Sequence, residues 1–183
     1  MLLLACGPHR VTPGAAAAKA PQPLAPRPLA EVFVLEAAGA EPEDTVVTVT
    51  PGSPRVVVLR RSAPDYGLFA RLEFAQHTLT PPGAGGTVRL TIHPTPGVYG
   101  LDLAVEGAVA DSARIVFSYG AHFVAPEGAR QRYGSNLAFE KELAIGRLSD
   151  SGVVVFLATL RPGSDMLSAP LPGPGRYLVA APR

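Results

Sequence analysis

The chain has 183 residues, of which 47% are hydrophobic, 17% charged and 7% aromatic, and its formal net charge is +1. No basic run and no stretch of about 18 apolar residues is present, so we expect neither a nucleic-acid partner nor a membrane-spanning helix. The single cysteine excludes an intramolecular disulfide.

The first seven residues contain an aliphatic residue at Leu3 and a small residue at Ala5, followed by Cys6. This pattern resembles the lipobox of bacterial lipoproteins, in which the cysteine becomes the lipid-modified N-terminus. Only four residues precede Ala5, whereas a signal peptide has a basic region and an apolar stretch of about 7–15 residues. Either the true start lies upstream, or the segment is not a signal. The resemblance implies an exported bacterial protein, periplasmic or anchored to the outer membrane only through Cys6.

Residues 8–30 contain six prolines and a run of four alanines, Ala15 to Ala18. Proline lacks a backbone donor and biases the preceding residue toward extended geometry, which disfavours both helix and sheet. We therefore predict that residues 1–30 form a signal remnant and a disordered linker. Such a linker suits a tether for a lipid anchor, and an ordinary disordered tail has the same composition.

From residue 31 onward, short runs of alternating apolar and polar residues are separated by proline and glycine, which predicts strands and turns. In Leu68–Gln76 the alternation places Ala70 and Leu72 on one face and Phe69 on the other. The number and spacing of the strands favour an antiparallel β-sandwich module over residues 31–124. The predicted strands are Glu31–Glu36, Thr45–Thr50, Arg55–Arg60, Leu68–Gln76, Thr87–His93, Val98–Glu106 and Ala113–Tyr119.

A Pro-Gly-x-Tyr sequence occurs twice, at Pro96 to Tyr99 and at Pro174 to Tyr177, each before a short apolar strand. It resembles the corner before the penultimate strand of immunoglobulin-like and fibronectin-like modules. That resemblance implies structural corners at Tyr99 and Tyr177, with each hydroxyl bonded to nearby backbone. A chance match in a chain rich in proline and glycine is the alternative.

The second corner predicts a smaller β module over residues 125–183. Four strands make a thin core, so we expect this module to pack on the first or to join it in one enlarged sandwich. Glu127 to Tyr133 has no apolar stripe and is predicted as a loop or a single helical turn. The four predicted strands of this module are Leu137–Leu148, Gly152–Leu160, Met166–Leu171 and Arg176–Ala181. For the first of them, a short helix capped by Ser135 or Asn136 is the competing prediction.

Residue patterns for catalysis or for cofactors are absent from the sequence. His93 and His122 follow predicted strands and would supply half a metal site, but zinc needs three or four ligands, so we predict no metal. There is no Gly-x-Ser-x-Gly elbow and no phosphate-binding glycine loop. Glu73 and Asp102 are interpreted as solvated carboxylates rather than as an acid–base pair. We predict no catalytic residue and no cofactor.

Four aromatic residues are candidates for an exposed ligand-stacking set: Tyr66, Phe69, Tyr119 and Tyr133. Tyr66 lies in the turn sequence Pro64-Asp65-Tyr66-Gly67, where an aromatic side chain has little reason to be buried. For the other members, packing over a sheet edge is the competing interpretation.

Together these features favour a non-enzymatic cell-envelope or surface module that binds a protein or an envelope component. A carbohydrate- or small-ligand-binding module, with an envelope polysaccharide as one partner class, is the alternative. An enzyme with a site dispersed over strand-end loops ranks third. The assignment to binding rests on what sandwich folds commonly do, which is an analogy at the level of the fold.

Overall fold

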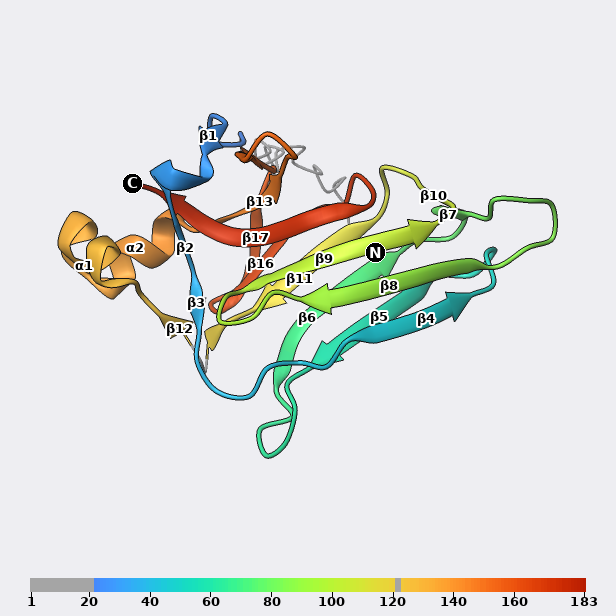
Figure 1. Ribbon diagram of the computed structural model, residues 1–183, viewed down its shortest axis with the longest axis horizontal. Coiled ribbons are helices and arrows are strands. Elements are labelled where there is room, and N and C mark those ends of the chain that lie inside the picture. Colours follow the sequence, from blue (N-terminus) through green and yellow to red (C-terminus); the bar gives the residue numbers. More distant parts are fainter. Residues whose placement is uncertain (1–21, 121–122) are drawn as a thin grey trace, which may run out of the picture.

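The structure is a computed structural model that describes residues 22–120 and 123–183. The predicted lipidation site Cys6 lies outside these residues, as do most of the predicted linker and His122. The described chain forms two facing antiparallel sheets with two short α-helices at one end (Figure 1). The prediction of an all-β antiparallel sandwich is therefore confirmed.

The larger sheet has eight strands and contains both early and late segments of the chain. Its β1 (Arg27–Pro28) falls inside the predicted disordered linker, where it pairs with β14 at the sheet edge, a position that tolerates proline. Along the sheet the order is β1, β14 (Val153–Phe156), β13 (Ala144–Leu148), β17 (Gly175–Pro182), β9 (Gly100–Glu106), β8 (Val88–Pro94) and β4 (Thr45–Val49), and β2 (Val32–Val34) also pairs with β17.

The smaller sheet has five strands, and β5 and β15 are its edges. Two further pairs of two-residue strands, which the sequence did not predict, join loops at the ends of the sandwich. The five-stranded order is β15 (Leu160–Gly163), β16 (Met166–Pro170), β11 (Arg114–Ser118), β6 (Leu68–Phe74) and β5 (Arg55–Arg60). The small pairs are β10 (Ala108–Val109) with β7 (Leu79–Thr80) and β12 (Phe123–Val124) with β3 (Glu36–Ala37).

Strands from the segment after residue 125 take part in both sheets. In the larger sheet β17 lies between β13 and β9, and in the smaller sheet β16 pairs with β11. The two corner tyrosines are therefore on neighbouring antiparallel segments, and the amide of Val179 donates to the carbonyl of Tyr99 (2.8 Å). Of the two arrangements expected for residues 125–183, this topology corresponds to the enlarged sandwich.

The core fills the space between the two sheets because alternate residues on each strand face inward. Leu90 and Ile92 of β8, and Leu101 and Leu103 of β9, are all at most 1% exposed. A second, smaller apolar cluster lies on the other face of the larger sheet, where Val32, Val154, Phe156 and Leu178 pack together. Apolar side chains are therefore also buried on part of the outer face of the larger sheet.

The prediction that Phe69 lies on the opposite face of β6 from Ala70 and Leu72, away from the core, is wrong. Leu59 pairs with Ala70, but Arg60 pairs with Leu68, so Phe69 is an extra residue on β6. Such a β-bulge interrupts the alternation of side chains between the two faces of a sheet. Phe69 consequently points into the core and is 1% exposed.

Two short helices are present. The first takes the place of the predicted loop or single helical turn, and the second, for which a helix was the competing prediction, replaces half of a predicted strand. The helix α1 (Glu127–Tyr133) ends at Gly134, which has a φ of 73° and donates its amide to the carbonyl of Arg130. The helix α2 (Asn136–Glu142) begins where the Ser135 hydroxyl accepts a hydrogen bond from the amide of Ala138 (3.1 Å). Of the predicted strand Leu137–Leu148, only the second half is extended. A three-residue 3-10 helix at Leu29–Glu31 completes the helical elements of the described residues.

Candidate functional site

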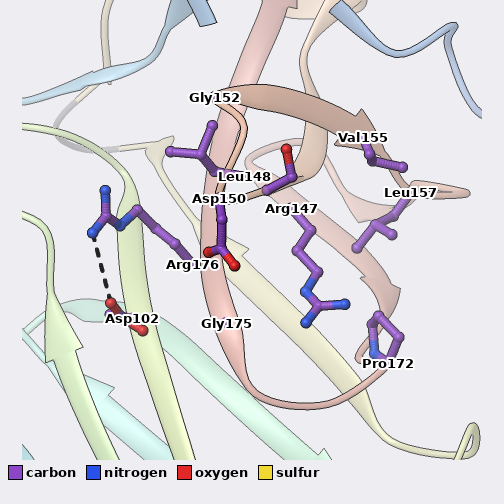
Figure 2. A pocket seen from close by; sticks show the side chains of 11 residues that line it. Asp102, Arg147, Leu148, Asp150, Gly152, Val155, Leu157, Pro172, Gly175 and Arg176 are labelled. Atoms are coloured by element: carbon purple, nitrogen blue, oxygen red, sulfur yellow. Dashed lines mark ion pairs between the residues drawn. The ribbon is translucent and has the colours of Figure 1, made fainter. Parts of the chain in front are cut away.

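A cavity of about 770 Å³ opens at the end of the larger sheet, beside the turn between β13 and β14 (Figure 2). Its lining combines two arginines and two aspartates with apolar side chains, and it includes no aromatic residue. The charged members are Asp102, Arg147, Asp150 and Arg176, and the apolar members are Leu148, Val155, Leu157 and Pro172.

The turn that forms one wall of the cavity is fixed by its own hydrogen bonds. The amide of Ser149 donates to the carbonyl of Val153 (2.9 Å), and the Ser149 hydroxyl accepts from the amide of Val153 (3.1 Å). Gly152 closes the turn with a φ of 76°, a conformation that glycine adopts without a steric penalty. Asp150 in this turn is exposed and belongs to the lining of the cavity.

The opposite wall includes Gly175 and Arg176, which belong to the second predicted corner, Pro174 to Tyr177, and Pro172 just before it. The hydroxyl of Tyr177 donates to the carbonyl of Gly173 (2.5 Å), the local bond that a tyrosine corner makes. Burial raises the pKa of Tyr177 to about 12. Arg147 donates from Nη2 to the carbonyl of Pro174 (2.6 Å), and a Cβ on Gly175 would lie 2.7 Å from its Nε. Glycine at position 175 therefore allows the arginine to lie against the corner.

The two arginines of the cavity differ in their electrostatic partners. Arg176 forms an ion pair with Asp102 (3.8 Å), and the guanidinium of Arg147 extends away from that pair toward Pro172 (Figure 2). Within the described residues neither Arg147 nor Asp150 forms an ion pair. Arg147 is thus a cation of the cavity with no carboxylate of the described chain within ion-pairing distance.

The structure does not bring the four predicted aromatic residues together as an exposed set. Tyr66 is 62% exposed, as predicted, whereas Phe69 and Tyr119 are 1% and 2% exposed. Tyr133 is half-buried against Phe33 and Phe139, and its hydroxyl donates to the carbonyl of Pro182 (2.6 Å). For Phe69 and Tyr119 the expectation of exposure is wrong, and only Tyr66 of the four is available for stacking on a ligand.

Phe69 and Tyr99 instead stack on each other, with ring centroids 5.3 Å apart, beside a buried arginine that sequence reasoning missed. Arg61 is 2% exposed, and its guanidinium carbon lies 5.5 Å from the ring centroid of Phe69 and 5.3 Å from that of Tyr99. It donates to the Tyr99 hydroxyl (2.7 Å) and to the carbonyls of Ala38 (2.9 Å) and Ala40 (3.1 Å). No pattern in the sequence distinguishes Arg61 from its exposed neighbour Arg60.

Tyr99 lacks the local hydroxyl bond that the corner resemblance implies. Its hydroxyl accepts from Arg61 and donates to the carbonyl of Tyr119 (3.2 Å), and its burial raises its pKa. Tyr119 in turn donates to Glu140 Oε1 (2.9 Å) and accepts from Arg161 (3.3 Å), and burial raises its pKa to about 12. Both tyrosines therefore connect elements inside the fold and do not present a surface to ligands.

Tyr66 is presented on a tightly held loop between β5 and β6. Its φ is 54°, which is unusual for a bulky residue and marks a constrained backbone. The amide of Arg61 donates to the carbonyl of Gly67 (2.8 Å), and the Ser62 hydroxyl donates to the carbonyl of Glu41 (2.7 Å). Asp65 lies 3.6 Å from the buried Arg61 in an ion pair. The loop that carries Tyr66 is thus braced on the core.

The strand that leads into this loop is an open sheet edge. In the described chain β5 pairs only with β6, and its outward-facing Val56 and Val58 are 57% and 43% exposed. Arg55 and Arg60 flank these valines, are exposed, and form no ion pair with any residue that the structure describes. We call the two outward-facing valines and the exposed Tyr66 of the following loop the β5 surface. Arg60 lies on the same face of the strand as the valines, whereas Arg55, which pairs with Phe74, lies on the opposite face at the other end.

Metal ligands do not assemble in the described ranges, where no group of three or more histidine, cysteine, aspartate or glutamate residues is placed to hold an ion. His93 Nδ1 lies 2.8 Å from a carboxylate oxygen of Asp44. No helix of residues 22–120 and 123–183 has the length and apolar character needed to cross a membrane. No protein-family model, curated protein or solved structure matches the chain.

Proposed function

We propose that the protein is a non-enzymatic module of the bacterial cell envelope that binds another protein through the β5 surface. The observation that carries the proposal is Tyr66, a large aromatic side chain held mostly in solvent by a loop braced on buried Arg61. Rigid exposed tyrosines are enriched among residues that dominate binding energy, because they bury much area with little loss of conformational entropy.

The free edge of β5 supports the same proposal. An unpaired edge strand presents a row of backbone donors and acceptors, and an extended segment of a partner satisfies them by adding a strand. Val56 and Val58 then lie beside alternate side chains of the added strand. The partner segment is therefore expected to be extended and to present small apolar or β-branched residues on its outward face.

The charge of the β5 surface defines the ends of the partner segment. Arg55 and Arg60 stand at the two ends of the strand without an ion pair in the described chain. Acidic residues on both sides of the apolar stretch complement these guanidinium groups, which raises the association rate and fixes the register. The proposed partner is thus a protein with an extended, β-branched segment flanked by acidic residues.

For location, the proposal rests on the lipobox-like Leu3-Leu4-Ala5-Cys6 and the proline-rich segment that follows it. A lipid on Cys6 would hold the sandwich near a membrane without a spanning helix. Expression of the gene with its upstream sequence in a Gram-negative host, followed by intact mass measurement of the wild type and Cys6→Ser, tests this. We expect acyl mass on the wild type only; an unmodified wild type contradicts the anchor.

The binding proposal is tested by placing a photo-crosslinking phenylalanine at Tyr66 and, as the matched control, at Leu137. The two side chains are 62% and 61% exposed, but Leu137 lies on α2, away from the β5 surface. After irradiation in cells of the source organism, we expect a specific protein adduct from position 66 alone. A carbohydrate adduct would support the alternative function, and identical products from both positions would refute the assignment to the β5 surface.

A synthetic strand tests the partner chemistry directly. A hexapeptide with alternating valine and threonine and a glutamate at each end is expected to shift the amide resonances of β5. Its lysine-ended counterpart has the same apolar centre and should bind at least about tenfold more weakly, which corresponds to about 1.4 kcal/mol. Equal binding of the two peptides would remove the argument from charge.

A further inference from the structure

We propose that the cavity beside the β13–β14 turn binds a small amphipathic anion, whose carboxylate or phosphate pairs with Arg147. This site lies on the larger sheet and does not depend on the β5 surface, so either assignment can fail without the other. Its volume of about 770 Å³ falls in the range of small-molecule sites.

The register of the larger sheet explains why an apolar group fits here. Val155 pairs with Arg147, Arg147 with Tyr177, and Tyr177 with Leu101, so the four side chains form one row on the core-facing side. Tyr177 and Leu101 are completely buried, but Val155 is 43% exposed. The row therefore runs from the buried core to the cavity, where Val155 lies with Leu157 and Pro172.

Arg147 supplies a pre-positioned cation in the same row. One of its five N–H donors bonds the carbonyl of Pro174, and the guanidinium itself lies against Gly175, so little conformational freedom remains to be lost on binding. Its other donors have no hydrogen-bond partner among the residues that the structure describes. A guanidinium next to apolar side chains binds an oxyanion through charge-assisted hydrogen bonds that are stronger than neutral ones.

The remaining charges of the lining restrict the ligand to a low net charge. Asp150 is an exposed part of the lining, and Arg176 is ion-paired with Asp102 (3.8 Å). A polyanion would meet the carboxylate of Asp150, whereas a monoanion with an apolar body satisfies Arg147 and covers Val155 and Leu157. The ligand class is therefore a monoanionic molecule with a short apolar chain, such as a medium-chain carboxylate or an alkyl phosphodiester.

The test is an NMR titration of the whole chain with octanoate, the phosphodiester methyl octyl phosphate, acetate and the neutral octyl glucoside. We expect saturable shifts at Arg147, Val155 and Leu157 with the two amphipathic anions, and little response to acetate or to the neutral compound. The anion that binds more tightly identifies the head group. Absence of saturation below about 10 mM, or equal binding of the neutral compound, would overturn the proposal.

Two variants with a matched control locate the site. Arg147→Gln should weaken binding about tenfold, while Arg176→Gln, which alters the ion-paired arginine of the same cavity, should change it less than about twofold. If Arg147→Gln does not fold, Val155→Trp fills the apolar side and should abolish binding with Arg147 intact. Equal effects of the two arginine variants, or undiminished binding by Val155→Trp, would contradict the assignment.

Discussion

Arg61 shows how one charged side chain is accommodated inside this sandwich. Its guanidinium is desolvated, but three oxygen acceptors and two aromatic rings surround it, and Asp65 stands nearby. Buried charges are tolerated when such partners replace water. The same contacts brace the loop of Tyr66, so the stability of the core and the presentation of the β5 surface depend on one residue.

Replacement of Arg61 by leucine is expected to lower the free energy of unfolding by about 3 kcal/mol. The variant removes the donor from the buried Tyr99 hydroxyl and from the carbonyls of Ala38 and Ala40, and it removes the ion pair with Asp65. A buried polar group left unsatisfied costs about 1–3 kcal/mol. Urea denaturation followed by circular dichroism measures the change. The adjacent, exposed Arg60→Leu is the control and should stay within about 0.5 kcal/mol of the wild type. Equal losses in the two variants would show that burial of Arg61 contributes little.

Tyr177 gives the protein a sensitivity to alkaline pH. Its pKa is raised to about 12 in the fold, compared with an ordinary value of 10.0, so the folded state favours the neutral phenol. The resulting stability is complete below pH 10 and is lost as the pH rises from 10 toward 12, because the unfolded chain releases the proton first.

The variant Tyr177→Phe cannot ionise at this position and lacks the bond to Gly173. We expect it to be less stable than the wild type at about pH 8, by about 1 kcal/mol, and the difference to shrink as the pH approaches the raised pKa of about 12. Tyr119 is present in both proteins and its contribution cancels. Urea midpoints measured across this range provide the comparison, and a difference that stays constant with pH would contradict the raised pKa.

At the scale of elements, α2 depends on the single cap at Ser135. Ser135→Ala removes the acceptor for the Ala138 amide and should destabilise the protein by about 1 kcal/mol. Ser53→Ala is the matched control, because Ser53 is exposed in a turn and its hydroxyl has no partner among the described residues. Thermal unfolding of both variants measures the effect. Equal melting temperatures would show that α2 is held by the packing of buried Phe139 rather than by its cap.

The strands were predictable wherever one face is buried and the alternation is unbroken. Thr45–Val49, Arg55–Arg60 and Met166–Pro170 appear close to their predicted bounds for this reason. The helix α2 was predicted only as the alternative to a strand, because Leu137, Phe139 and Leu143 fit a strand face as well as a helix. The bulge at Phe69 depends on pairing with β5, which a pattern within one strand does not contain.

The candidate sites also differ in how far the sequence alone predicts them. Exposure of Tyr66 followed from its proline- and glycine-flanked turn, since that signal is local. The cavity was not predicted, because Arg147 and Pro174 meet only after β13 and β17 have paired. Burial of Arg61 likewise requires Phe69 and Tyr99, which lie on or beside strands of two different sheets. Sequence patterns therefore found the local feature and missed those built by contacts distant along the chain.

At the scale of the molecule, the interleaving of early and late strands predicts one cooperative unit. Because β17 pairs with β9 and β16 with β11, separating residues 125–183 from the rest would expose edges in the middle of both sheets. Native-state hydrogen exchange should give the amides of β9 and β13 the same opening free energy. A markedly lower value for β13, with β9 still protected, would show that the later segment opens independently.

The position of β17 also determines when the fold can be completed. It is synthesised after every other strand of either sheet, yet it lies between β9 and β13 and also pairs with β2. Until residue 182 is available, β9 has an open edge and Tyr99 lacks the neighbouring strand that covers it. The larger sheet can therefore form completely only after β17 has emerged from the ribosome. Until then, β9 and β13, which pair with β17, have unpaired edges.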